Sequence, residues 1–551
     1  MDFDLREIPF SRRGSWLALS PVVASGVVAD DVHLVTHQTR QVGVFALRPS
    51  EASELVATPE VLRWEAAAGR IEAVFETVDT VRFRGRGTAL ELEADDEAHL
   101  FVDPTDLSPV FASHASGRRY RVTMLRGEAT TGPGRSVRLD GAEGWEAVIE
   151  EFGTARPPYG EKQTTDGRPA EFDQVVAEVR AEFGAFVERV AGWRTAEYPA
   201  AEAAAYVLWA SIVRADGFIT REAALMSKHW MDRVWSWDHA FNALALAPGE
   251  PELALDQFLM PFDHQETSGA LPDVVGHSGI VYNFVKPPIH GWAWRKLSGA
   301  ADPEVYERLA AWTNFWLDRR RVPGHALPHY QHGFDSGWDN ATIFDHEPVI
   351  ESPDLATVLV LQLDALTALA EELGRADDAA YWSTTADEIV AALLSELYDG
   401  NGFVARGALS RTPSKTTSLV TALPIMLGRR LPAEVVEQLV VKIRRHLTDW
   451  GLASEDPGSE DYAADGYWRG PIWAPPSVLL DDGLRSVGQV ELADEASSRF
   501  RRLCERSGFA ENFDALTGEG LRDRAYTWTA SAYLLLARED AARRRHVVPA
   551  T

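Results

Sequence analysis

The chain has 551 residues, more than one ordinary hydrophobic core accommodates, so two or more domains are expected. Its apolar share of 45% is that of a globular protein. The 54 Lys and Arg and the 83 Asp and Glu residues give a formal net charge of −29. This charge argues against nucleic acid and anionic membrane surfaces as partners, because both require a basic footprint.

Residue usage indicates a reducing compartment. Cys504 is the only cysteine, so no intrachain disulfide can form. The acidic N-terminus lacks the apolar core of a signal peptide. No stretch approaches about 18 uninterrupted apolar residues, the length of a membrane span. We therefore expect a cytoplasmic monomer or homo-oligomer that does not cross a membrane.

The first part of the chain, residues 1–165, is predicted to be a β-sandwich domain. Residues 42–47 and 71–92 are rich in β-branched and aromatic side chains, and parts of them alternate with a period of two. The pattern continues in 119–126, and Gly and Asp clusters separate the runs. Such a succession of strands favours a sandwich.

A Pro- and Gly-bearing linker, 156–169, separates these strands from a second domain, residues 166–551, in which the apolar period becomes helical. Apolar residues at helical spacing begin at Phe172, and further helices are predicted at 200–214, 304–320, 354–373, 376–397, 432–447, 491–507 and 526–540. Helices without intervening strands favour a bundle, solenoid or toroid. Long loops rich in Trp, Gly, His and Asp separate several of them, and loops of this length are usually functional.

The most informative motif is Ser336-Gly337-Trp338-Asp339-Asn340. An aromatic face accepts the apolar C–H face of a pyranose, and an amide can recognise a hydroxyl. A carboxyl between them can protonate a glycosidic oxygen. The motif therefore predicts a sugar site.

Three further residues have two interpretations each. Asp238, which precedes an apolar helical run, either caps that helix or binds sugar hydroxyls beside Trp237. Lys286 is either a surface lysine or a cation placed by the two prolines that follow it. Arg469, next to Trp468, either pairs with a surface acid or binds the substrate.

Spacing alone does not single out a second carboxylate, since Glu511 has a local rival in Asp514. The spacing of His325, His329 and His332 hints at a metal, but Pro328 would interrupt a helix there and the sequence contains no His-Glu-x-x-His. We therefore expect no metal site. The sequence also shows no phosphate-binding loop and no nucleophile elbow.

Together the segments resemble glycoside hydrolase family 63 and its relatives with a six-hairpin α/α toroid, such as trehalase and glucoamylase. The matching segments follow the family's order between roughly residues 200 and 540: Trp237-Asp238 with Phe241, Lys286-Pro287-Pro288 with Gly291-Trp292, Ser336 to Asn340, Glu351 to Leu355, Tyr467 to Pro471, and Glu511 ahead of Thr517-Gly518 and Trp528. Any one segment is weak, whereas the ordered set is specific.

The resemblance implies an (α/α)6 catalytic domain over residues 166–551 and an inverting, exo-acting α-glycosidase that hydrolyses an α-linked glucoside or mannoside of a small oligosaccharide or glycoside. Asp339 is then the general acid and Glu511 the general base, without metal or organic cofactor. The residues expected to bind the small carbohydrate are Trp237, Asp238, Lys286, Trp338, Asn340, Trp468, Arg469, Trp473 and Trp528.

The N-terminal stretch from Ile8 to Ser15, with the strands after it, looks like the β-domain of bacterial glycogen-debranching-like enzymes. The mannosylglycerate and glucosylglycerate hydrolases of the family usually lack so large a domain. We expect the domain to pack on the toroid; the alternative is a module on a flexible tether. A non-catalytic sugar-binding protein and a phosphorylase or epimerase on a similar toroid stay open as other functions.

Overall fold

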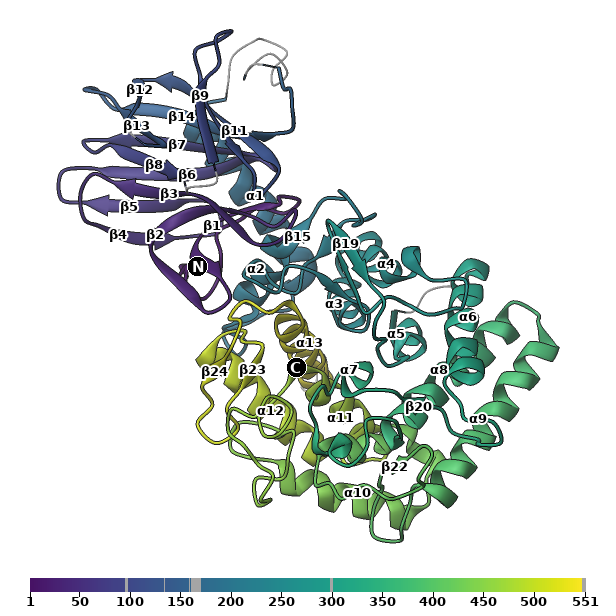
Figure 1. The fold of residues 1–551 in the computed structure, drawn as a ribbon. Helices are drawn as coiled ribbons and strands as arrows, with labels where there is room; N and C mark the ends of the chain where they lie inside the picture. The colour runs from purple at the N-terminus through teal and green to yellow at the C-terminus, as the bar shows by residue number, and fades with distance from the viewer. Residues whose placement is uncertain (95–97, 133, 158, 160–169, 298–300, 548–551) are drawn as a thin grey trace.

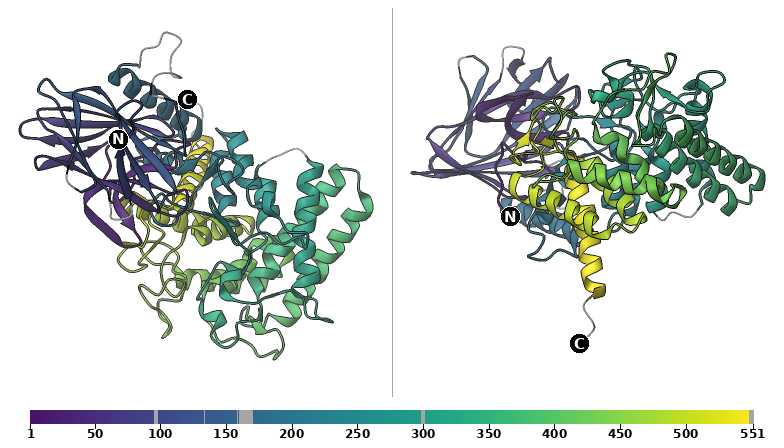
Figure 2. Two further views of the ribbon diagram at one scale, coloured as in Figure 1. Left: turned by 45° about the horizontal axis from the view of Figure 1, so that its top comes forward. Right: turned by 90° about the horizontal axis from the view of Figure 1, so that it is seen from below.

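The computed structural model describes residues 1–94, 98–132, 134–157, 159, 170–297 and 301–547 (Figure 1). Its N-terminal region is rich in β-structure and its C-terminal region is helical. The expected linker and the boundary between residues 165 and 166 lie largely outside the described residues. Figure 2 shows the β-rich region against one side of the helical region in both views.

The N-terminal strands form two antiparallel sheets in the described part of the chain. In spatial order, the first contains β1 (Leu17–Ala24), β2 (Val27–Thr36), β3 (Val42–Pro49), β8 (Leu90–Ala94), β13 (Ser136–Asp140) and β12 (Glu128–Thr131). The second contains β4 (Ser53–Ala57), β5 (Leu62–Ala66), β6 (Arg70–Thr77), β7 (Thr80–Arg86), β14 (Trp145–Phe152), β11 (Arg118–Arg126), β10 (Pro109–Ser113) and β9 (Ala98–Val102).

One hydrophobic core joins the two sheets. In β8, Leu90 and Leu92 are fully buried while Glu91 and Glu93 are not, as the period of two requires. The ring of Phe45, on β3 of the first sheet, lies 5.2 Å from that of Phe111 on β10 of the second. The apolar faces of both sheets are therefore buried against each other.

The helical region contains α1 (Phe172–Ala191), α2 (Ala201–Ser211), α3 (Asp238–Leu246), α4 (Pro251–Leu259), η1 (Pro261–His264), α5 (His290–Leu297), α6 (Pro303–Arg319), α7 (Gly333–Ser336), η2 (Thr342–Phe344), α8 (Pro353–Glu372), α9 (Ala376–Glu396), η3 (Leu419–Arg430), α10 (Ala433–His446), α11 (Ala474–Ser486), α12 (Val490–Ser507) and α13 (Thr527–Val547). Short strands lie between them: β15 (Ile212–Val213), β16 (Ala223–Ala224), β17 (Val234–Trp235), β18 (Val274–Gly276), β19 (Gly279–Val281), β20 (His329–Tyr330), β21 (Ile350–Glu351), β22 (Arg406–Gly407), β23 (Asn512–Phe513) and β24 (Gly520–Leu521).

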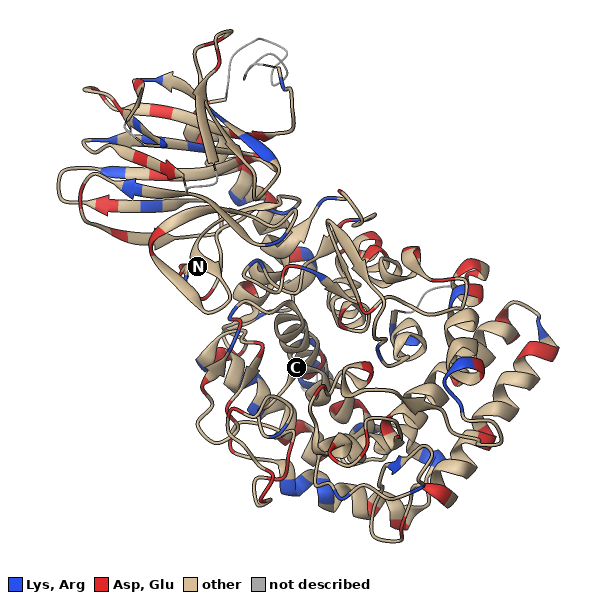
Figure 3. Ribbon diagram, in the orientation of Figure 1, with Lys and Arg blue, Asp and Glu red and all other residues tan. Residues whose placement is uncertain are grey.

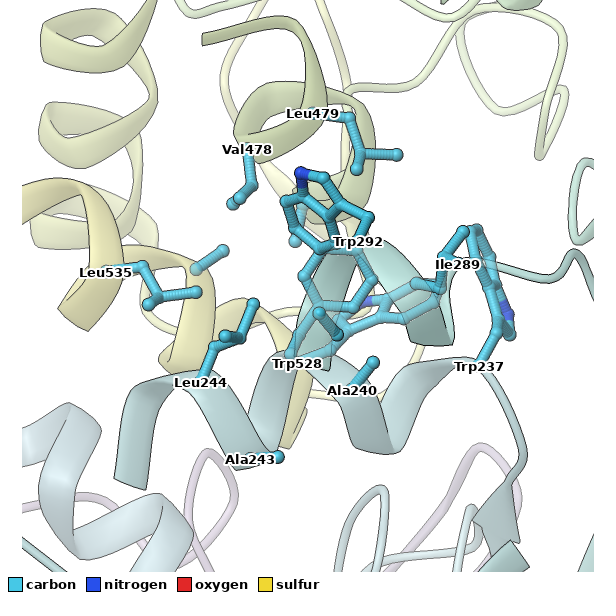
Figure 4. Close-up of a cluster of buried hydrophobic side chains, with 14 of the residues drawn as sticks. Trp237, Ala240, Ala243, Leu244, Ile289, Trp292, Val478, Leu479, Trp528 and Leu535 are labelled. Atoms are coloured by element: carbon cyan, nitrogen blue, oxygen red, sulfur yellow. The ribbon is translucent and has the colours of Figure 1, made fainter. Parts of the chain in front are cut away.

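The helices contact one another in a closed order. α3 contacts α5, and the contacts continue through α8, η3, α11 and α13 back to α3. The helices α2, α4, α6, α9, α10 and α12 each contact a member of this ring. Figure 4 shows Trp237, Trp292 and Trp528 packed among the apolar side chains of α3, α11 and α13.

Burial distinguishes the two sets of helices. The ring helix α8 is buried almost all round, whereas α10 buries mainly Val435, Leu439, Val440 and Ile443 along one stripe. α8 is also long and apolar enough to cross a membrane by length and composition, but 78% of its apolar window is buried inside the protein. That burial identifies it as a core helix of this fold.

Most helices expected from periodicity agree with the structure within a few residues. η3 and α11 were not predicted, because both carry prolines. In α11, Pro475 and Pro476 lie in the first turn, where a missing N–H costs no intrahelical bond. Pro424 lies inside η3, and Gly428 breaks the helical geometry near its end.

The ring helices share one further property that places the site. Each follows a long segment of the chain, for example 447–473 before α11 and 508–526 before α13, while short connections lead from a ring helix to the next outer one. The motifs found in the sequence lie in these long segments.

Lys, Arg, Asp and Glu residues are spread over both regions of the molecule (Figure 3).

Candidate active site

A cavity of about 50 Å³ brings together several of these long segments. It is lined by Met231, Trp235, Trp237, Asp238, Lys286, Gly337, Asp339, Tyr467, Trp468, Trp473, Tyr526 and Trp528. Seven of the predicted site residues are among them: Trp237, Asp238, Lys286, Asp339, Trp468, Trp473 and Trp528. The lining does not include Trp338, Asn340, Arg469 or Glu511.

Tryptophans form the wall of the cavity. The rings of Trp468 and Trp473 stack with centroids 4.0 Å apart and planes 4° from parallel. Trp528 meets both Trp473 and Trp237 edge to face, each at 5.7 Å. The indole Nε1 of Trp528 is buried and has no hydrogen-bond partner in the described part of the protein. The wall thus offers flat apolar faces and one available N–H donor, which together suit a sugar ring.

Gly337 allows this wall to close. Its φ of 71° lies in the left-handed region. A Cβ at this position would stand 2.4 Å from the Trp237 ring. The next residue, Trp338, is 2% exposed and packs on Trp468 at 4.6 Å. Trp338 therefore lies behind the wall instead of lining the cavity, contrary to the expectation that it contacts the sugar.

The Asp339 carboxyl lies in the cavity, in a field of other charges. Burial raises the pKa of Asp339 to about 6, with Lys286 lowering it and Asp273 raising it. Lys286 is 5% exposed, and its Nζ lies 3.0 Å from Oδ1 of Asp273 and donates to the Phe334 carbonyl at 2.5 Å. Lys286 is therefore a placed cation of the site and not a surface lysine.

Asp238 is the first residue of α3, but its side chain does not cap the helix. Trp237 occupies the N-cap position, and no side-chain capping bond is formed there. The carboxyl is 3% exposed, and its Oδ2 has no hydrogen-bond partner among the described residues. Burial raises the pKa of Asp238 well above its usual value, while nearby Lys286 lowers it. A buried acceptor without a partner at a cavity is a natural place for a ligand hydroxyl.

Glu511 lies near Tyr467, outside the lining of the cavity, and is 4% exposed. Its backbone N–H donates to the Asp523 carbonyl at 2.7 Å. Burial raises the pKa of Glu511 to about 7, the charge of Asp523 raises it further, and Tyr467 and Arg522 lower it.

Tyr467 links the two carboxyls. Its own pKa is raised well above the usual value by burial and by the charges of Glu511 and Asp339. Tyr467 therefore lies close to both acids. The sequence suggested that the environments of an acid and a base would separate their pKa values, but burial raises both here.

Asn340 and Arg469 hold the loops together. The Asn340 amide donates to the Gly466 carbonyl at 3.0 Å and accepts from the Trp468 N–H at 2.9 Å. Arg469 Nε donates to the Asn340 carbonyl at 2.8 Å, and its guanidinium pairs with Asp345. The expectation that both side chains hold the sugar is not supported by this geometry, since their polar groups are engaged within the protein.

The other candidates have structural partners. Asp514 accepts from the backbone N–H groups of Leu516 and Thr517 in a turn. His325 lies 2.6 Å from Glu351, which also pairs with Arg406 and Arg411. Among the described residues, no group of three or more His, Cys, Asp and Glu is arranged to hold a metal ion.

Five residues that line the cavity and one that supports it were not among the predicted site residues. Met231, Trp235, Gly337, Tyr467 and Tyr526 line it, and Asp273 anchors Lys286. Tyr467 precedes Trp468 in the segment Tyr467 to Pro471, and its aromatic hydroxyl could have marked it as a site residue. Asp273 had none, because its pairing with Lys286 appears only when two separate segments meet.

Comparison with known proteins shows the family of the chain. Residues 231–529 match the model of the mannosylglycerate hydrolase MGH1-like glycoside hydrolase domain. A mannosylglycerate hydrolase of Rubrobacter radiotolerans is 23% identical over 399 residues, covering 54% of this chain and 89% of that protein. A glucosylglycerate hydrolase of Mycolicibacterium hassiacum is 21% identical over 423 residues, covering 58% of this chain and 94% of its own.

Solved structures show the same fold. The family 63 mannosylglycerate hydrolase of Thermus thermophilus in complex with glucose superposes with a TM-score of 0.53 at 21% identity, covering 62% of this chain and 100% of that one. A bacterial glucoamylase in complex with acarbose gives a TM-score of 0.63 at 11% identity and covers 98% of this chain and 96% of its own. The glucoamylase likeness thus includes the N-terminal region.

The family match and these relatives identify the chain as a glycoside hydrolase. The chain belongs to the MGH1-like glycoside hydrolases, within glycoside hydrolase family 63.

Proposed function

We propose that the protein is an inverting, exo-acting α-glycosidase that releases an α-linked glucose or mannose from a small oligosaccharide or glycoside. Family membership makes the chain a hydrolase, so a non-catalytic binding protein and a phosphorylase or epimerase are no longer needed as alternatives. The observation that carries the proposal is the position of Tyr467 beside both Asp339 and Glu511, at a cavity walled by tryptophans.

In the proposed mechanism, protonated Asp339 gives its proton to the glycosidic oxygen as the bond from that oxygen to the anomeric carbon breaks. A water molecule attacks the anomeric carbon from the opposite face. Ionised Glu511 takes a proton from this water, and the products are a free sugar and an alcohol. The Tyr467 hydroxyl would hold the Glu511 carboxyl in place through a hydrogen bond.

The sugar in the cavity would be held by its apolar faces and its hydroxyls. Trp237, Trp468, Trp473 and Trp528 would cover the ring, with the free Nε1 of Trp528 donating to a hydroxyl. The free Oδ2 of Asp238 would accept from another. The cavity is small, which favours binding of a single terminal sugar over an internal stretch of a chain, and we therefore propose exo action.

We also propose the finer architecture that this function requires. The closed ring of helices, each with an outer partner, supports an (α/α)6 toroid over residues 166–551. The shared core of the two sheets supports a β-sandwich over residues 1–165. A cytoplasmic location, a monomeric or homo-oligomeric state, and a small carbohydrate as partner, without nucleic acid or membrane, complete the proposal.

A substrate panel tests the proposal. The full chain is incubated with α-glucosides and α-mannosides, including mannosylglycerate, glucosylglycerate and short α-linked oligosaccharides, and the released monosaccharide is quantified. We expect one class to be hydrolysed, with a single sugar released per event from the non-reducing end. Release of internal oligosaccharides, or no hydrolysis of any member, would contradict the proposal.

A further inference from the structure

The N-terminal segment from Glu7 to Ser15 contacts a buried lysine of the helical region. Lys228 is 1% exposed, and its Nζ donates to Oγ of Ser11 at 2.9 Å and to the carbonyl of Ser15 at 2.5 Å. In the described part of the chain, no carboxylate pairs with it. Burial and the nearby Arg214 lower the pKa of Lys228 well below its usual value, which favours the neutral amine, so the side chain holds the segment through its two hydrogen bonds.

The loop that carries Lys228 also reaches the site. The neighbouring Ser227 donates from Oγ to Oδ2 of Asp523 at 2.5 Å and accepts from the His229 N–H at 3.1 Å. Four residues along, Met231 lines the cavity. The tip of the loop is held from the N-terminal region as well, because Nδ1 of His37 lies 3.2 Å from Oδ2 of buried Asp232.

Asp523 in turn holds Glu511. Its carbonyl accepts from the Glu511 backbone N–H at 2.7 Å, and its charge raises the pKa of the Glu511 carboxyl. The N-terminal segment also contacts the residue after Asp523, since Nε of Arg524 donates to Oε2 of Glu7 at 2.7 Å. Asp523 is fully buried.

We propose that the N-terminal segment is a positioning element of the active site, which fixes Asp523, and thereby Glu511, through Lys228 and Ser227. The inference rests on the proposed role of Glu511 as the base. The segment and Lys228 both lie outside residues 231–529, the part matched by the family model.

The test compares variants of the full-length protein. Lys228→Met keeps most of the length of the side chain and removes the amine that binds Ser11 and Ser15, and Ser227→Ala breaks the bond to Asp523. Arg12→Ala is the matched control, because Arg12 belongs to the same segment but binds Glu182 and the carbonyls of Phe75 and Glu76, away from the site. Glu511→Gln is the reference for the base itself.

We expect Lys228→Met and Ser227→Ala to lower kcat about ten- to a hundredfold, the cost of a small misplacement of a reacting group. KM and the Kd of a monosaccharide inhibitor should stay within about twofold, because the sugar-binding wall is untouched. The pH profile of kcat should also shift on the limb that belongs to Glu511, which faces Asp523, Tyr467 and Arg522. Lys228→Met should also melt lower than the wild type, since the Ser15 carbonyl and Ser11 hydroxyl lose their donor, so its kcat is read at a temperature where the variant is folded.

Three results would count against the inference or its basis. Wild-type kcat in Ser227→Ala and Lys228→Met, with Glu511→Gln inactive, would overturn the positioning role and leave the proposed function intact. An equal loss in Arg12→Ala would also overturn it, because docking in general would then be responsible. Full activity of Glu511→Gln would instead refute the proposed function. If Lys228→Met fails to fold, Ser227→Ala, the smaller change, decides.

Discussion

Tyr467 lies beside the carboxyl of Glu511 and lowers its pKa, and the charge of Asp339 acts on the same tyrosine. The backbone of Tyr467 has a φ of 63°, an uncommon value for a residue with a side chain. The Asn340 bonds to Gly466 and Trp468 hold the loop on either side of it. The loop thus holds a strained tyrosine between the two acids proposed to act on the substrate.

Removing either carboxylate should abolish most of the turnover. Asp339→Asn and Glu511→Gln should each lower kcat about 10²–10⁴-fold, the usual contribution of one proton transfer. Steady-state kinetics on the best substrate of the panel measures this. Asp514→Asn, a change in a nearby turn, should retain the wild-type rate, and a near-wild-type rate in either of the first two would refute that residue's role.

Activity should depend narrowly on pH. Glu511, with a pKa raised to about 7, must be ionised, and Asp339, with a pKa raised to about 6, must be protonated. Activity is therefore lost as pH falls, because Glu511 gains a proton, and as pH rises, because Asp339 loses one. We expect kcat/KM to peak between these two values. A flat profile from pH 5 to 8 would show that these groups do not control the rate.

Glu511→Gln should stabilise the protein at alkaline pH. Because the folded pKa of Glu511 is raised above its ordinary 4.5 to about 7, ionising it in the folded state costs free energy at pH 8 and nothing below pH 4.5. The variant should therefore gain up to about 3 kcal/mol in the free energy of unfolding at pH 8.

Melting curves at two pH values test this. The gain should shrink as pH falls through 7 toward 4.5, where the wild-type glutamate is protonated in both states. An equal shift of Tm at both values would mean that the effect comes from packing and not from charge.

Asp238→Ala should weaken the binding of a monosaccharide inhibitor by about 0.5–1.5 kcal/mol, because a buried hydroxyl would lose its hydrogen bond to a carboxyl whose raised pKa favours the neutral form. Calorimetric titration measures the affinity, and a melting curve of the same variant separates binding from stability. Loss of a helix cap alone would lower stability by about 1 kcal/mol and leave the affinity unchanged.

The sequence indicates site residues where a local motif holds both an aromatic and an acid. It does not show which polar side chains bond to other loops instead of facing the cavity. Trp237, Asp238 and Asp339 line the cavity as expected, because their motifs contain both the aromatic and the acid. Asn340 and Arg469 have the right chemistry but use it to join loops, which no local pattern reveals.

In the fold too, local features could be predicted from the sequence and long-range contacts could not. Long periodic helices such as α8 and α9 were predicted within a few residues, since their apolar spacing is a local property. The order of the strands in the two sheets, and the contact of Lys228 with the N-terminal segment, depend on residues far apart in sequence. Such pairings cannot be deduced from one sequence by periodicity.

The configuration of the first sugar released tests the central proposal most directly. Proton NMR during hydrolysis of an α-glucoside or α-mannoside from the panel follows the anomeric signals before mutarotation mixes them. Attack by a water that Glu511 activates, on the face opposite the bond that Asp339 protonates, predicts that the β-anomer appears first. Early appearance of the α-anomer would show retention of configuration and contradict the roles proposed for both residues.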